Sequence, residues 1–546
     1  MTACGTDAAR GPDDEGVGGG GGAGASTAGT SGNAGSTAGS SAGAATSSGG
    51  ATSANGGAPS SGGAMSASGG SVSAASGGVS TASGGTESGG SPPSGSGGAP
   101  SAGGTAGTGG ALAGTGGAET GLPSGVTYLF PPPGGTGVCP DAPLRMRFAG
   151  APALGSSGKV VVHDASGAVV ASVDLAVATV SDTIGGTAFT LPRRAFVDGN
   201  DAVVYLKTKA LAYGKSYYVT VEGAAITPPG GGSFTVADAS VWRFTTKSAA
   251  PSAVSALHVA LDGAGDFCTV QGALDALPAS NTTPATITVA AGTYHEVVHS
   301  RGKDAITLHG ADRKQTIVSG TNNNNLNPST STRSLVGFDD TKNLVIENLT
   351  IHNTTPQNGS QAEALRLQGC DQCVVRDADI LSLQDTLLWS GRVYAKDCYI
   401  EGNVDYVWGT GIAYFDSCEL RTVGRTGVIV QARNAAGAYG YVFVNSKLTA
   451  DAAATGNVLA RIDASAYPGS QVAYVNCEMQ SIAPAGWMLT AGSATSSLRF
   501  WEYGSHDAAG NALDVSRRLA GSAQISASQA TTLMSPSAVL GGWTPP

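Results

Sequence analysis

A strand-and-turn pattern that recurs along the C-terminal half of the chain constrains the fold more than any other feature. In each copy, apolar residues alternate around a polar turn, with a small or apolar residue at the centre. The copies span residues 345–351, 374–380, 394–400, 414–420, 442–448 and 473–479. Successive centres lie 29, 20, 20, 28 and 31 positions apart, a spacing typical of solenoid coils with loops of varying length. The pattern predicts an all-β fold, a right-handed parallel β-helix.

The central residues are expected to point into the interior of the solenoid and to stack there. Three of them are Cys398, Cys418 and Cys477, which we interpret as core residues rather than redox or metal-binding groups. Cys370 and Cys373 form a C-x-x-C pair, but no second pair or histidine stands at ligand spacing. The sequence therefore predicts no metal site and no cofactor.

The chain divides into three segments by composition. It has 83 glycines, and residues 1–122 consist almost entirely of Gly, Ser, Ala and Thr. Such a segment buries too little apolar area to offset the entropy of ordering, so we expect a disordered tail or linker. Residues 123–248 carry short runs of β-branched and aromatic residues between turns, which predict a β-sandwich. Residues 249–546 hold the repeat.

The sandwich segment resembles bacterial Ig-like modules. The resemblance rests on Phe130-Pro-Pro-Pro-Gly, on Leu211-Ala-Tyr-Gly-Lys-Ser-Tyr-Tyr-Val and on the closing Trp242-Arg-Phe-Thr-Thr. No cluster of titratable residues stands out in this segment. We expect it to act as a spacer, and glycan binding is the alternative.

The charge balance gives no support to nucleic-acid binding. The net charge is -10 and charged residues make up 12% of the chain, which suits a neutral or partly neutral substrate. No run approaches the ~20 apolar residues of a membrane span. Cys4 follows small residues and precedes the Gly-rich tract, so it is a candidate lipidation site, with chance occurrence as the alternative. The other seven cysteines are an odd number and cannot all pair internally.

Two aspartates occupy equivalent places in consecutive copies of the repeat. Asp385 lies seven residues after the centre Ala378, and Asp405 lies seven residues after Cys398. Because neighbouring parallel strands are about 4.8 Å apart, the two carboxyl groups should stand side by side. Two carboxylates that close cannot both ionise without cost, so one pKa should rise. One protonated and one ionised carboxyl group form an acid and nucleophile pair.

Three polar residues are expected near this pair. Gln384 precedes the first aspartate, Gln361 lies one coil earlier, and Arg461 lies on a later coil. Amide groups can stabilise an oxyanion without titrating, and a guanidinium can keep Asp405 ionised. The alternative is that Asp and Gln at coil turns merely satisfy backbone groups. The convergence of five residues favours ester hydrolysis.

The third segment resembles the pectinesterase family. The matching stretches are His258-Val-Ala-Leu-Asp-Gly-Ala-Gly-Asp-Phe-Cys-Thr-Val-Gln, Gly292-Thr-Tyr-His-Glu, Gln361-Ala-Glu-Ala-Leu, Gln384-Asp-Thr-Leu and Val404-Asp-Tyr-Val-Trp-Gly. The resemblance implies that Asp405 is the nucleophile of a methylesterase and that Asp385 is first the acid and then the base. It also implies that Gln361 and Gln384 stabilise the oxyanion, and that the substrate is pectin.

The chain departs from the family pattern at aromatic positions. Where the family usually has Leu-Gly-Arg-Pro-Trp, this chain reads Leu459-Ala-Arg-Ile-Asp463, so an aspartate replaces a tryptophan that packs on a sugar. Trp408, Trp389 or Tyr467 is a candidate replacement for that stacking face. Ordinary core packing is the alternative for each tryptophan.

Three competing functions stay open. A pectate lyase or polygalacturonase also uses a parallel β-helix, but the glutamine pair suits neither chemistry. Altered aromatics would permit an esterase acting on another acylated polysaccharide. A non-catalytic, glycan-binding surface β-helix would explain the sandwich and the tail. In each case we expect a secreted or cell-surface monomer, lipid-anchored if Cys4 is modified.

Overall fold

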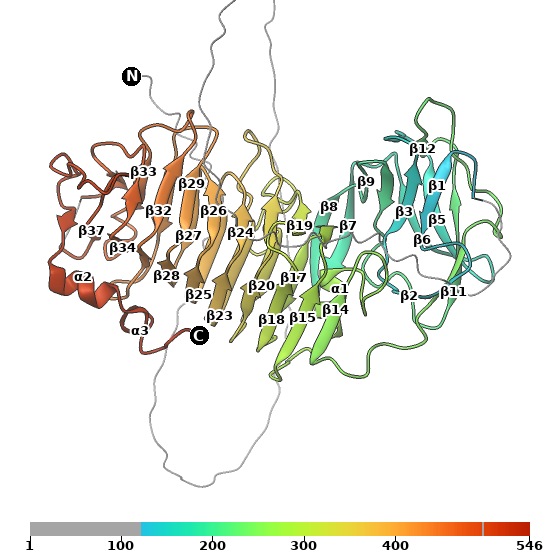
Figure 1. Ribbon diagram of the computed structural model, residues 1–546, viewed down its shortest axis with the longest axis horizontal. Coiled ribbons are helices and arrows are strands. Elements are labelled where there is room, and N and C mark those ends of the chain that lie inside the picture. Colours follow the sequence, from blue (N-terminus) through green and yellow to red (C-terminus); the bar gives the residue numbers. More distant parts are fainter. Residues whose placement is uncertain (1–121, 494–495) are drawn as a thin grey trace, which may run out of the picture. The chain divides into compact units, whose positions relative to one another are not determined.

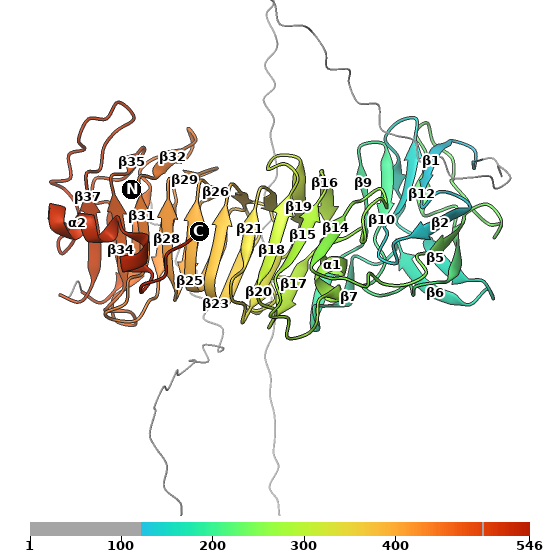
Figure 2. The ribbon, with the colours of Figure 1, turned by 60° about the horizontal axis from the view of Figure 1, so that its bottom comes forward.

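The computed structural model describes residues 122–493 and 496–546 of the chain. Its larger part is a stack of coils in which parallel strands pair with the equivalent strands of the next coil (Figure 1). The pairings form three ladders, here called A, B and C, and Figure 2 shows strands of ladder A following one another from β14 to β37. The predicted parallel β-helix is confirmed.

Ladder A consists of β14 (Ala256–Val259), β15 (Ala285–Val289), β18 (Ile306–Gly310), β21 (Val345–Glu347), β28 (Ile412–Asp416), β31 (Tyr441–Val444), β34 (Gln471–Val475), β37 (Arg499–Tyr503) and β38 (Ala523–Gln524). Ladder B consists of β16 (Gly292–His295), β19 (Thr316–Gly320), β22 (Thr350–Asn353), β24 (Asp379–Leu381), β26 (Tyr399–Gly402), β29 (Glu419–Thr422), β32 (Lys447–Ala450) and β35 (Glu478–Met479). Ladder C consists of β17 (Val298–Arg301), β20 (Val336–Asp339), β27 (Val404–Gly409), β30 (Val428–Ala432), β33 (Val458–Asp463) and β36 (Trp487–Ala491). Two long strands, β23 (Leu365–Arg376) and β25 (Leu387–Lys396), belong to both A and C.

The polar turn of each repeat copy connects ladder A to ladder B through a left-handed residue. The residue before each centre has a φ between 49° and 56°, and these residues are Asn348, Asp377, Asp397, Ser417, Asn445 and Asn476. Asn and Asp tolerate this conformation better than other non-glycine residues because their short polar side chains hydrogen-bond locally. The turn therefore points every following centre inward, and Cys398, Cys418 and Cys477 are confirmed as buried core residues.

A stack of aromatic rings fills the interior at the C-terminal half of the β-helix. Trp389 lies parallel to Phe415 with ring centroids 5.3 Å apart, and Phe415 lies parallel to Phe443 at 4.4 Å. The stack continues through Tyr474 to Trp487. Phe415, Phe443 and Tyr474 meet face to face because they stand at equivalent, in-register positions of ladder A. Trp389 and Trp487 join the two ends of this stack from ladder C.

The N-terminal strands form two sheets around one shared core, as predicted for a sandwich. One sheet has the order β1 (Val126–Phe130), β3 (Leu144–Phe148), β10 (Asp201–Val204) and β9 (Ala195–Asp198). The other has the order β2 (Gly135–Val138), β13 (Arg243–Thr246), β11 (Ser216–Val221), β5 (Lys159–Asp164) and β6 (Val169–Asp174). A short pair joins β4 (Ala153–Leu154) to β12 (Ile226–Thr227). The Ig-like assignment and the boundaries of the three segments stay predictions.

One hairpin of the N-terminal segment packs into the β-helix core. It consists of β7 (Thr179–Ile184) and β8 (Thr187–Pro192), and its apolar side chains Ile184, Phe189 and Leu191 join the same cluster as Val298 and Val336. Because this hairpin covers apolar side chains of the first coils, the segment does more than the spacer role that its sequence indicated.

Three short helices complete the described part of the chain. Helix α1 (Val270–Ala276) lies near β14, β15 and β17, and Thr269 caps its N-terminus. Helices α2 (Ala527–Leu533) and α3 (Pro536–Val539) cover the outer face of ladder A, where Leu533 and Leu540 pack in a cluster with Tyr414. Among the described residues, no helix is long and apolar enough to cross a membrane. The predicted tail, residues 1–122 and including Cys4, lies outside the described residues apart from Leu122.

Candidate active site

The two aspartates lie where neighbouring strands of ladder C begin, Asp385 two residues before β25 and Asp405 as the second residue of β27. Leu387 pairs with Val407 and Leu388 with Trp408, so Asp385 and Asp405 occupy equivalent positions on consecutive coils, as the repeat predicted. Both have left-handed backbones, with φ of 64° and 48°. The Asp385 N–H also donates to the Val404 carbonyl at 2.9 Å. Backbone register therefore brings the two side chains to one place.

Arg461 holds Asp405 as the sequence predicted. Its Nε donates to Asp405 Oδ1 at 2.8 Å, and its Nη2 donates to Asp405 Oδ2. Arg461 comes from β33, two coils beyond β27 along ladder C. The planar guanidinium fork fixes the orientation of the carboxylate as well as supplying charge.

Asp385 has a partner that sequence reasoning missed. Arg333 donates from Nη2 to Asp385 Oδ2 at 3.0 Å, and from Nε and Nη2 to Glu363 at 2.7 to 3.0 Å. Glu363 is fully buried. The sequence signal for this partner was the lone carboxylate of Glu363 in the mostly apolar stretch Ala362-Glu-Ala-Leu-Arg-Leu, because a buried charge requires a partner.

The surroundings separate the two aspartates electrostatically. Burial raises the pKa of Asp385 well above its usual range, and the nearby Glu363 carboxylate raises it further against the charge of Arg333. Burial also raises the pKa of Asp405, but Arg461 opposes that rise by its charge and its hydrogen bonds. The carboxyl group with the larger rise keeps its proton to higher pH, so the surroundings favour a protonated Asp385 beside an ionised Asp405.

The two glutamines lie on adjacent coils beside the aspartates. The Ala362 N–H donates to the Gln384 carbonyl at 3.1 Å, and Gln384 bridges to Val404. Both glutamines are partly exposed. Within the described residues, 122–493 and 496–546, neither side-chain amide forms a hydrogen bond. Both amides are therefore free to donate to a bound group.

Of the three candidate stacking residues, two lie at the site. Trp408 is 7% exposed, and two guanidinium groups lie against its ring, with Arg333 at 5.5 Å and Arg433 at 5.1 Å from the ring centroid. Arg433 also lies 5.6 Å from the Tyr467 ring. Trp389 is 1% exposed and stacks in the core on Phe415, so its ring has no face open to a substrate. Trp389 is therefore a core residue, which was the alternative interpretation of this tryptophan.

The aspartate that replaces the family tryptophan shapes a turn. Asp463 Oδ1 accepts from the Ser465 and Ala466 N–H groups at 3.0 Å, and the Asp463 carbonyl accepts from the Tyr467 N–H at 2.8 Å. Aspartate commonly stabilises turns in this way. The hydrogen bonds of Asp463 therefore order the turn that holds the Tyr467 ring next to Arg433.

A cavity of about 210 Å³ lies apart from the aspartate pair, between the N-terminal sheets and α1. Glu296 lines it, and burial raises the pKa of this carboxyl group to about 7. Glu296 accepts from the Val270 and Gln271 N–H groups at 2.8 and 3.0 Å. Glu296 therefore stabilises the first turn of α1. The pair of Asp385 and Asp405 is the better candidate for catalysis.

Comparisons with known proteins point to one family. The family model "Pectinesterase" matches residues 256–540. Pectinesterase 31 of Arabidopsis thaliana is 30% identical over 205 residues, which are 35% of this chain and 64% of that protein, just under two thirds of its length. Pectinesterase 1 of Olea europaea is 34% identical over 261 residues, which are 44% of this chain and 67% of that protein. A solved pectin methylesterase from carrot is 25% identical with a TM-score of 0.48, covering 54% of this chain and 95% of that chain.

Proposed function

This chain belongs to the pectinesterase family, and from that membership and its carboxylate pair we propose that it is a carboxylic ester hydrolase acting on the methyl esters of pectin. The observation that carries the proposal is the placement of Asp385 and Asp405 on consecutive coils, with Arg461 bound to Asp405 alone. The products are pectate and methanol.

The reaction has two steps. Asp405 attacks the C6 carbonyl carbon of a methylated galacturonate, and Asp385 protonates the departing methanol as the acyl-enzyme forms. Gln361 and Gln384 donate hydrogen bonds to the oxyanion. Asp385, now a carboxylate, then removes a proton from water, which attacks the acyl-enzyme and releases Asp405.

The charges around the pair suit a polymer that carries free carboxylates beside its esters. Three arginines and three carboxyl groups meet there: Arg333, Arg433, Arg461, Glu363, Asp385 and Asp405. When Asp385 is protonated, positive charges exceed negative ones by one. A local positive excess favours the approach of an anionic chain, and contact with the Tyr467 ring or with the small exposed part of Trp408 would add to sugar binding.

Methanol release from highly methylated pectin tests this function. The full chain should release methanol, and the Asp405→Asn variant should not. Asparagine is the suitable replacement because it tolerates the left-handed backbone of position 405. Release of unsaturated oligosaccharides without methanol would instead identify a lyase, and binding without any turnover would identify a non-catalytic β-helix.

We also propose that the protein acts outside the cell as a monomer, with Cys4 as the attachment point of a lipid anchor and residues 123–248 as an Ig-like module. Support comes from the sequence of the first 122 residues and from the substrate, a polymer too large to enter a cell. Cell fractionation of the wild type and a Cys4→Ser variant tests the anchor. Release of the variant alone into the medium is the expected result.

A further inference from the structure

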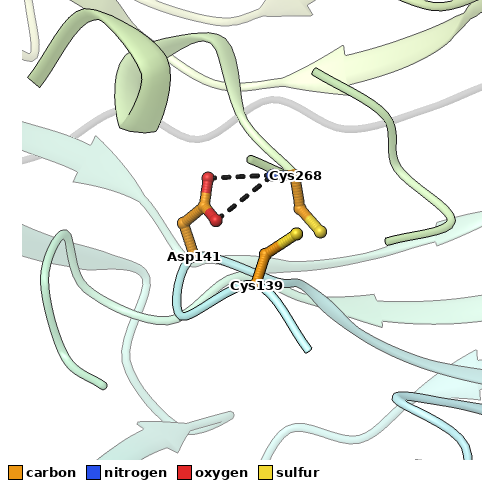
Figure 3. Close-up of side chains that lie close together, drawn as sticks. All are labelled: Cys139, Asp141 and Cys268. Carbon is orange, nitrogen blue, oxygen red and sulfur yellow. Dashed lines mark hydrogen bonds between the residues drawn. The ribbon is translucent and has the colours of Figure 1, made fainter. Parts of the chain in front are cut away.

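Two cysteines that are distant in sequence meet between the N-terminal sheets and the first helix of the β-helix. Cys139 follows β2, and Cys268 lies just before α1. Both are 0% exposed, and both belong to the core cluster of the N-terminal sheets. Their sulfur atoms and an Asp141 carboxylate oxygen all lie within 4.8 Å of one another. Figure 3 shows the two sulfurs pointing toward each other.

The backbones that carry these cysteines are fixed to each other. Asp141 accepts hydrogen bonds from the Cys268 N–H at 3.1 and 3.2 Å, and from the Thr269 N–H and hydroxyl at 2.8 and 2.6 Å. Thr269 in turn is the N-cap of α1. The closeness of the sulfurs is therefore set by an ordered hydrogen-bond network.

The same three side chains fit a metal ion less well. A structural zinc site has four ligands, whereas this is a group of three, the only such cluster in the part of the chain that the structure describes. The Asp141 oxygens are already engaged by backbone N–H groups. The carboxylate is thus committed to Cys268 and Thr269, and the two sulfurs are left facing each other.

We propose that Cys139 and Cys268 form a disulfide bond that ties the N-terminal sheets to the β-helix. Both S–H bonds break and one S–S bond forms, while two protons and two electrons pass to an oxidant disulfide, which is reduced to two thiols. Side-chain rotation brings the sulfurs to the bonded distance of about 2 Å. The bond closes a loop of about 130 residues and so restricts the unfolded chain strongly.

The bond forms during folding, while an oxidant can still reach the two thiols. Burial raises the pKa of Cys268, and the neighbouring Cys139 thiol raises it further. Thiol–disulfide exchange requires a thiolate that the oxidant can reach, so the folded, reduced pair is inert. The same burial protects the finished bond from reductants.

Mapping the bond tests the proposal directly. The full chain is refolded with oxidised and reduced glutathione and then denatured in the presence of iodoacetamide, which blocks free thiols. The alkylated protein is digested without reductant and analysed by mass spectrometry. One linked pair of peptides should contain Cys139 and Cys268 and should disappear on reduction. Reduction of the refolded protein under denaturing conditions, followed by refolding in reductant, should lower its Tm by about 5 °C or more.

Matched variants separate the bond from general effects of cysteine loss. Cys139→Ala should leave Cys268 alkylated and should abolish the difference in Tm between oxidised and reduced protein. Cys477→Ala, a buried core cysteine, should keep both the linked peptides and that difference. Alkylation of both Cys139 and Cys268 in the oxidatively refolded wild type, a bond from either of them to a different cysteine, or one zinc ion retained per chain would each overturn the proposal.

Discussion

Glu363 should control the pH range of the reaction although it does not bind the reacting ester. Its carboxylate shares the Arg333 guanidinium with Asp385 and raises the pKa of that aspartate. Glu363→Gln removes the negative charge and frees the positive charge of Arg333 for Asp385. Both effects stabilise the Asp385 carboxylate and lower its pKa. Asp385 therefore loses, at lower pH, the proton that it donates to the leaving group.

The magnitude follows from the geometry of the shared guanidinium. Arg333 Nη2 lies 2.7 Å from Glu363 Oε1 and 3.0 Å from Asp385 Oδ2, so these oxygens are at most about 5.7 Å apart, where unit charges repel by about 3 kcal/mol at an effective dielectric constant of about 20. Each 1.4 kcal/mol is about tenfold in an equilibrium. On the basic limb of the pH profile, kcat/KM should therefore fall by about tenfold to a hundredfold.

The assay is methanol release, measured as kcat/KM from acidic to basic pH. In this profile the acidic limb reports ionisation of Asp405 and the basic limb reports ionisation of Asp385. Glu363→Gln should move the basic limb to lower pH and leave the acidic limb in place. Glu347→Gln, which removes a carboxylate paired with Arg376 on ladder A, should change neither limb. A basic limb that stays in place or moves to higher pH, in a variant whose thermal melt shows it folded, refutes the reasoning.

Other variants should separate chemistry, charge and packing. Asp405→Asn should lower kcat by about 10³-fold or more while substrate binding persists, which equilibrium binding to pectin oligomers measures. Arg461→Gln removes the interaction that lowers the pKa of Asp405, so the acidic limb of the kcat/KM profile should move to higher pH. Trp389→Ala should cost about 3–5 kcal/mol of unfolding free energy in urea titrations, because it opens a cavity in the ring stack. Trp408→Ala should mainly raise KM, and an unchanged KM would exclude a contact with the sugar.

The parts of the fold that depend on local repetition were predictable from the sequence. The polar turn before each centre, such as Asp397 before Cys398, fixes which side chains point inward, and a strict strand register then aligns Asp385 with Asp405. The packing of the β7–β8 hairpin into the β-helix core was not predictable, because its apolar alternation suits either core equally well. Long-range contacts between unlike segments leave no periodic signal.

The same distinction explains which site residues the sequence revealed. Residues on the repeat, such as Asp405, were located by counting from a centre, whereas Arg333 enters from a loop before β20, where spacing carries no information. Only the buried charge of Glu363 demanded such a partner, and it did not say which arginine would supply it. Because the proposed acid and nucleophile are both aspartates, only the arginines that contact them distinguish the two. The Arg461 guanidinium binds Asp405 alone, whereas the Arg333 guanidinium is shared between Asp385 and Glu363. That unequal division of positive charge supports the two proposed roles.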